Sequence, residues 1–123
     1  MRVFILLIMV LTAGGCGDKN QEARSYAESI INSYLKDPDT AKYKNVTVSR
    51  IKQSGSHPDM VHVCGLVNAR NGFGAYTGNS KFVVSFLDSP SPELIHKEVA
   101  TPNTITDDSS SSYWQTYCTV KNS

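Results

Sequence analysis

The residues best suited to chemistry in this 123-residue chain are three cysteines and three histidines. They are Cys16, Cys64, Cys118, His57, His62 and His96. A zinc site needs about four grouped ligands, and only His62 and Cys64 are near each other, two residues apart on one face of an expected strand. Two ligands do not complete such a site. We therefore expect no bound metal, and no cofactor motif is apparent.

No candidate nucleophile sits in a pattern that would activate it. The chain lacks the G-x-S-x-G turn that presents a catalytic serine. His57 precedes Pro58 in a polar stretch, and Asp107-Asp108 lacks the ligand spacing of a calcium loop. The sequence therefore predicts a protein that is not an enzyme.

The N-terminus has the layout of an export signal. Arg2 precedes an uninterrupted apolar run over residues 3–11, and small residues lead from there to Cys16. A membrane-spanning helix needs roughly 20 apolar residues, so this run is too short to be one. We expect a signal peptide over residues 1–15, a lipidated cysteine and short tether over residues 16–21, and a single domain over residues 22–123.

The stretch LTAGGC, which ends at Cys16, resembles the lipobox of bacterial lipoproteins. That resemblance implies a cysteine acylated with chains such as palmitate, which would anchor the protein to a membrane. Ala13 stands where that family prefers leucine, so a secreted protein cut near Ala13 and carrying no lipid stays an alternative. Gly17 occupies the position where inner-membrane lipoproteins often have aspartate. It favours the outer membrane, facing the periplasm, within the bacterial cell envelope.

Assigning Cys16 to lipid leaves Cys64 and Cys118 as an even pair. In the oxidising compartment that the signal implies, one disulfide is the simplest interpretation, with a metal pair or a reactive thiol as alternatives.

The charges of the chain are balanced. The formal net charge is +1, and Arg2 in the signal segment accounts for it. A neutral mature chain without a basic cluster is not suited to nucleic acid, whose binding depends on neutralising phosphates. It is equally unsuited to binding a membrane surface through charge alone.

The elements that must hold these residues begin with a helix. Apolar residues recur at three- and four-residue spacing over residues 22–35, which predicts an amphipathic helix. Asp37-Pro38 is expected to close the helix, within a turn over residues 36–43. Alternating or compact apolar runs then predict strands over residues 46–50, 60–70 and 81–87, with a weaker one over 94–100. Residues 113–120 are rich in β-forming types and predict a last strand.

One helix followed by four or five strands predicts an α+β fold. Because a single helix cannot supply parallel crossovers, we expect an antiparallel meander packed on the helix.

Residues 63–78, VCGLVNARNGFGAYTG, are the densest signal in the chain. The glycine spacing does not match a dinucleotide fingerprint, and a strand rather than a helix follows it. We expect a long hairpin connection in which glycines supply positive φ and Asn68 and Asn71 bond to the loop backbone. Phe73 and Tyr76 either pin the loop over the sheet edge or contact a partner. The candidate contact loop comprises Asn68, Asn71, Phe73 and Tyr76.

Two stretches, YLKDPDTAKYKNV and VCGLVNARNGFGAYTGNSKFVV, resemble an uncharacterised small domain of bacterial and phage-encoded exported lipoproteins. Its pattern runs L-K-D-P-D/E-S/T-A-K-F/Y, then V-C-G-x-V-N-x-K/R-N-x-x-G-x-Y-x-G, then F. The resemblance spans about residues 34–86, and Ala75 departs from it where glycine is frequent. The matching positions are Leu35, Asp37, Pro38, Ala41, Tyr43, Cys64, Gly65, Asn68, Asn71, Gly74, Tyr76, Gly78 and Phe82. The resemblance implies a fold and a location, and no activity.

Two classes of function fit these observations. In the first, the protein is a membrane-anchored binding module for a protein or cell-envelope partner, of the inhibitor, immunity or exclusion type. In the second, it is a structural subunit of an envelope assembly that adds an edge strand to a neighbour. The polar segment between Cys16 and the helix would hold the domain close to the membrane, which favours the first class and a membrane-associated partner.

Overall fold

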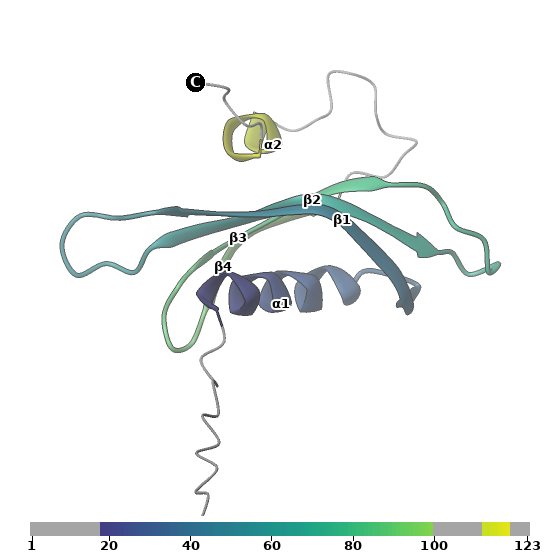
Figure 1. The fold of residues 1–123 in the computed structure, drawn as a ribbon, viewed down its shortest axis with the longest axis horizontal. Helices are drawn as coiled ribbons and strands as arrows, with labels where there is room; N and C mark the ends of the chain where they lie inside the picture. The colour runs from purple at the N-terminus through teal and green to yellow at the C-terminus, as the bar shows by residue number, and fades with distance from the viewer. Residues whose placement is uncertain (1–17, 100–111, 119–123) are drawn as a thin grey trace, which may run out of the picture.

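The computed structural model describes residues 18–99 and 112–118. The expected signal peptide, the expected lipidation site at Cys16 and Asp107-Asp108 lie outside these residues. The described chain forms one helix, four strands and a short second helix in the order α1-β1-β2-β3-β4-α2. The four strands make an antiparallel sheet in sequence order, with α1 on one face and α2 on the other (Figure 1). The expected α+β fold, a meander packed on an N-terminal helix, is confirmed.

Helix α1 spans Lys19–Asn32, which shifts it three residues toward the N-terminus of the expected range. Asp18 is the N-cap, and its side chain accepts a hydrogen bond from the backbone N–H of Asn20. This cap satisfies a free N–H group of the first turn, so the helix starts within the segment expected to be a tether. Since the helix ends at Asn32, Asp37-Pro38 opens the next strand and does not close the helix.

Strand β1 spans Asp37–Ile51, and its first half was expected to be a turn. Pro38 is compatible with this strand because β1 lies at an edge of the sheet, where a missing N–H breaks no ladder. The register shifts between Lys44 and Thr47, where Asn45 has a φ of 53°. Asparagine tolerates this left-handed conformation, and such a bulge changes which side chains face the helix. As a result Tyr43 and Val46 both pack toward the core.

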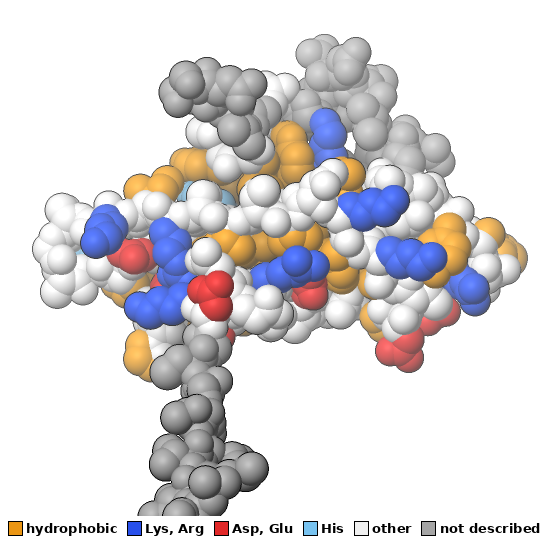
Figure 2. Space-filling view, in the orientation of Figure 1, with side chains coloured by type: hydrophobic (Ala, Val, Ile, Leu, Met, Phe, Trp, Pro, Cys, Tyr) orange, Lys and Arg blue, Asp and Glu red, His pale blue; other side chains and the backbone are white. Residues whose placement is uncertain are grey.

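The core lies between α1 and strands β2 (Met60–Arg70) and β3 (Ser80–Leu87). Figure 2 shows hydrophobic side chains between the helix and the strands, with Lys and Arg side chains around them. Residues from α1, β2 and β3 contribute Ala23, Ala27, Ile31, Val61, Val63, Val67, Phe82, Val84 and Phe86. Val61 and Val63 face the helix, so His62 and Cys64 share the opposite face of β2, as expected.

Gly65 allows the closest approach within this core. It lies opposite Phe82 in the strand register, and a Cβ at Gly65 would lie 2.9 Å from Cε1 of the Phe82 ring. A methyl at this position would also meet Val46 at 3.0 Å. The Phe82 ring occupies the space that a side chain at position 65 would need. Cys64 faces the opposite side of the sheet, where it forms the disulfide.

Strand β4 spans Glu93–Val99 and forms the second edge. The expected last strand is wrong, because Ser112–Tyr117 forms helix α2. Tyr113 and Tyr117 are four residues apart, so a helical turn puts both rings on one side, facing the sheet. Among the described residues, no helix is both long and apolar enough to cross a membrane.

Candidate functional site

The connection between β2 and β3, over residues 71–79, contains the predicted contact residues and is held by its own polar groups. The side-chain oxygen of Asn71 accepts hydrogen bonds from the N–H groups of Phe73 (2.9 Å) and Ala75 (3.2 Å). The Asn71 backbone N–H donates to the carbonyl of Ala75 at 2.8 Å. Gly74 completes the turn with a φ of 78°, a conformation that favours glycine. Asn71 therefore shapes the tip of the loop.

Asn68 fixes the base of the loop. Its side-chain oxygen accepts a hydrogen bond from the Gly78 N–H at 3.1 Å, and Gly78 has a φ of 96°. The expectation that both asparagines bond to loop backbone is confirmed. Because their oxygens are engaged in this way, Asn68 and Asn71 position the loop and offer little for contact with a partner.

Tyr76 pins the loop to the neighbouring strand. Its hydroxyl donates to the carbonyl of Thr40 in β1 at 3.3 Å. Two cations lie over its ring, with Lys42 Nζ at 4.7 Å and Arg70 Cζ at 5.3 Å from the centroid. These contacts stabilise the aromatic ring against the sheet. Tyr76 was expected either to pin the loop over the sheet edge or to contact a partner. Its contacts agree with pinning.

Phe73 has the opposite environment. Its exposed fraction is 97%, the largest of the exposed hydrophobic residues in the described part of the chain. Gly72 and Gly74 flank it, and a Cβ on either glycine would meet nothing within 4 Å. Pinning of the loop by Phe73 is therefore wrong. The loop holds an apolar ring in solvent on a backbone that hydrogen bonds keep in place.

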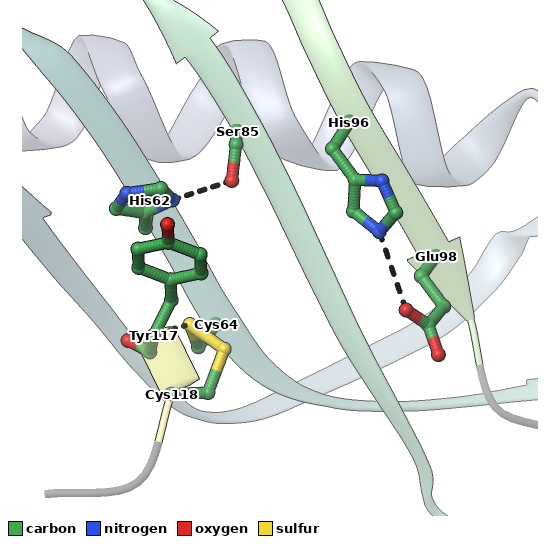
Figure 3. The surroundings of a disulfide bond; sticks show 7 residues. All are labelled: His62, Cys64, Ser85, His96, Glu98, Tyr117 and Cys118. Carbon is green, nitrogen blue, oxygen red and sulfur yellow. Dashed lines mark hydrogen bonds and ion pairs between the residues drawn. A yellow bond between two sulfur atoms is a disulfide. The ribbon is translucent and has the colours of Figure 1, made fainter. Parts of the chain in front are cut away.

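The other face of the sheet carries the disulfide. Cys64 of β2 and Cys118, directly after α2, are bonded, with their Cα atoms 5.6 Å apart (Figure 3). The expected pairing is present, but it joins a strand to a helix where two strands were expected. Cys64 Sγ also lies 3.8 Å from the Tyr117 carbonyl oxygen. Because a disulfide sulfur has no proton, this is a packing contact.

His62 lies buried beside this disulfide, with an exposed fraction of 2%. Its Nδ1 is 2.5 Å from the hydroxyl oxygen of Ser85 in β3, and the Tyr117 ring stacks on the imidazole with centroids 4.1 Å apart. Nε2 is buried and has no hydrogen-bond partner among the described residues. Burial lowers the pKa of His62 below its usual value of 6.5, since the charged imidazolium is poorly solvated there.

His96 of β4 extends this cluster. Its ring stacks on Tyr113 with centroids 3.9 Å apart, and its Nε2 lies 3.3 Å from a carboxylate oxygen of Glu98. Burial raises the pKa of the Tyr113 phenol above its usual value, and its interaction with Ser85 partly opposes this rise. Helix α2 therefore rests on two histidines through two tyrosines, with Ser85 between them.

A serine and a histidine in hydrogen-bond contact are the types found in nucleophilic catalysis. Here, however, Ser85 has an exposed fraction of 0%, and the rings of α2 cover the pair. A substrate would reach Ser85 only if α2 moved. With α2 in place, the pair acts as a buried polar contact that fixes how the helix sits on the sheet.

Sequence reasoning missed Ser85, Tyr113 and Tyr117 as partners of the histidines. The signal that could have found them is the four-residue spacing of the tyrosines beside Cys118, which is typical of one helical face. Within residues 18–99 and 112–118, no three residues among His, Cys, Asp and Glu are grouped so that they could hold a metal.

Comparison with known proteins gives no relative for this chain. No family model, curated protein or solved structure matches it.

Proposed function

We propose that this protein is a membrane-anchored envelope lipoprotein that acts as a non-enzymatic binding module, and that Phe73 is the centre of its contact with a protein partner. The exposure of the Phe73 ring carries the proposal. The ring is 97% exposed on a loop that its own hydrogen bonds hold in place, and hot spots of protein interfaces are large side chains that become well buried on binding. Burying a phenylalanine side chain contributes about 1.5–3 kcal/mol.

The order of the loop supports the same function. Binding costs about 0.5–1.5 kcal/mol for each flexible side chain that becomes fixed, and a preformed backbone reduces the ordering cost further. The hydrogen bonds of Asn71 and Asn68 and the contact of Tyr76 with Thr40 hold the loop before a partner arrives. Phe73 then needs only to fix its own rotamer.

A structural subunit that adds an edge strand to a neighbour is the second candidate. The edge strands β1 and β4 carry exposed apolar residues, Ile51 at 46% and Ile95 at 47%. Lysines on both edge strands, among them Lys42, Lys44 and Lys97, disfavour pairing with another chain. The loop is therefore the better candidate.

Two measurements test the proposal. The intact mass of the membrane-purified protein should correspond to residues 16–123 plus acyl chains, and reduction should add two hydrogens. A mass without lipid, with cleavage near Ala13, would contradict the anchor. For the contact, chemical cross-linking in the envelope should give one discrete adduct with the wild type and with Ile95→Ala. Phe73→Ala should lose this adduct, and an adduct of unchanged yield would contradict the role of the loop.

A further inference from the structure

A pocket of about 530 Å³ opens between the C-terminal end of α1 and the sheet. It is lined by residue 31 of the helix, residues 34–36 just after it, residue 77 of the β2–β3 loop, and parts of β2, β3 and β4. The β2–β3 loop and the α1–β1 connection lie at this same end of the molecule (Figure 1). Pockets that bind small ligands have volumes of about 300–1,000 Å³, so this one is large enough to hold a ligand.

The interior of the pocket is apolar. Its walls include side chains that also belong to the core or pack against it, namely Ile31, Leu35, Val67, Ala69 and Val99. Water gains few hydrogen bonds in such a space, and an apolar chain placed there would be removed from water. The lining therefore selects an apolar group for the deeper part of the site.

The polar part of the lining is mainly cationic. Lys36, Arg70 and Lys97 contribute three positive charges. Glu98 is the one carboxylate of the lining, and it also contacts His96 at 3.3 Å. Lys97 Nζ lies 4.6 Å from the centroid of the Tyr34 ring, which keeps this cation near the pocket. In Figure 2, Lys and Arg side chains surround hydrophobic ones toward this end of the molecule.

We propose that this pocket binds an anionic amphiphile, a single apolar chain that ends in a carboxylate or phosphate. The chain would lie against the apolar wall, and the anionic head would lie among Lys36, Arg70 and Lys97. This site adjoins the β2–β3 loop, whose Thr77 is part of its lining, but binding there does not require the contact through Phe73. It gives the protein a second ligand, of a chemical class that is abundant in membranes.

The chemistry of the lining favours this class over others. A neutral apolar molecule would leave the cations without a counterpart, while a small inorganic anion would leave the apolar wall in contact with water. A molecule with both features satisfies the two parts of the lining at once, because opposite charges attract strongly where water is partly excluded.

The test uses the mature chain, residues 16–123, carrying Cys16→Ser, so that neither an acyl chain nor the apolar signal segment competes for the pocket. Laurate, dodecyl phosphate and dodecanol are each titrated as competitors of a fluorescent dansyl fatty acid. Laurate and dodecyl phosphate should displace the probe saturably and at lower concentration than dodecanol. Which of the two anions binds more tightly distinguishes a carboxylate from a phosphate head.

Variants separate the head from the chain. Replacing both Lys36 and Lys97 with glutamine should weaken laurate binding by about five- to tenfold, as expected for two partly exposed charges, and leave dodecanol unchanged. Lys52→Gln, in the loop before β2, is the matched control and should behave as the wild type. Ala69→Phe should fill the pocket and abolish binding of all three competitors, with circular dichroism to check that it folds.

Three results would overturn the proposal. The absence of saturable binding by the wild type is one, and it is the result expected if a segment of a partner protein fills the pocket. Dodecanol binding as tightly as laurate is the second. The third is an affinity for laurate that is unchanged when both lysines are replaced. None of these bears on the Phe73 contact, which cross-linking tests separately.

Discussion

The β2–β3 loop and the disulfide face of the sheet differ in what they do with their aromatic rings. Beside the disulfide, Tyr113 and Tyr117 lie against His96 and His62, and the polar atoms of Ser85 and His62 are enclosed. In the loop, polar side chains hold the backbone and Phe73 is 97% exposed. The first region is closed by a covalent bond, and the second is ordered but open. The difference separates residues that hold the fold together from those available to a partner.

Removal of the disulfide should have the largest effect on stability. Replacing both Cys64 and Cys118 with serine frees a loop with a sequence separation of 54. The entropy of closing a loop of this length is worth on the order of 4 kcal/mol, so the free energy of unfolding should fall by about that much. Urea denaturation measures it. If the loop acts independently of the disulfide face, the Phe73-dependent cross-link persists under all conditions in which the variant is folded. A variant that is folded but has lost the adduct would show that the disulfide face also determines partner contact, which contradicts independent roles for the two regions.

The stability of the disulfide face should depend on pH through His62. Its pKa is lowered by burial in the folded state, so the unfolded chain binds the proton more readily. The free energy of unfolding is therefore highest above pH 6.5, the ordinary value, and falls as the pH drops below it. The slope of this loss is at most about 1.4 kcal/mol per pH unit for one proton.

Thermal unfolding between pH 5 and 8 measures this dependence. His62→Gln should flatten the profile, because glutamine does not titrate and can still contact Ser85. His57→Gln, in the exposed loop before β2, is the control and should leave the profile unchanged. Equal profiles for the wild type and His62→Gln would mean that His62 does not contribute to the pH dependence.

Asn71→Ala should lower both the stability of the fold and the yield of the partner cross-link, but unequally. It removes the oxygen that accepts from Phe73 and Ala75, so stability should fall by about 1 kcal/mol, as for a partly exposed hydrogen-bonded group. The cross-link should weaken by more than this loss explains, because the loop then pays an ordering cost on binding. Asn45→Ala, at the bulge of β1 and away from the loop, is the control for a general loss of stability. A cross-link of unchanged yield in Asn71→Ala would show that loop order does not matter for contact.

Phe73→Ala should have the smallest effect on stability. An almost fully exposed side chain contributes little to the folded state, so the change should stay within about 0.5 kcal/mol. Tyr26→Ala is the matched aromatic comparison, because its ring packs edge-on against Phe86 with centroids 4.6 Å apart, and it should cost about 1.5–3 kcal/mol. A loss above 1 kcal/mol in Phe73→Ala would mean that the ring packs against the domain.

The sequence predicted those parts of the fold that local patterns determine. Periodic apolar residues identified α1 and the strands β2, β3 and β4. The bounds of β1 were missed because Pro38 is a sign of a break, and only the position of β1 at a sheet edge makes it acceptable. The composition of residues 113–120 favours a strand, but the structure has helix α2 there. In this helix Tyr113 stacks on His96 and Tyr117 stacks on His62, contacts that the local sequence does not reveal.

The candidate site was predictable to a similar degree. The roles of Asn68 and Asn71 follow from the short reach of an asparagine side chain to nearby backbone. Whether Phe73 or Tyr76 faces solvent depends on Thr40, Lys42 and Arg70, which only the strand pairing brings to Tyr76. The pocket is built from four separate elements, so no local pattern in the sequence indicates it.

We propose that the partner contacts the protein through the β2–β3 loop. The most direct measurement places a photoreactive benzophenone amino acid at position 73 in one chain and at position 95 in another, with irradiation in the intact envelope. Ile95 is an apolar residue of β4, 47% exposed and outside the loop. We expect a discrete adduct from position 73 and little from position 95. Equal yields from both positions, or a stronger adduct from position 95, would contradict it and favour contact through the sheet edge.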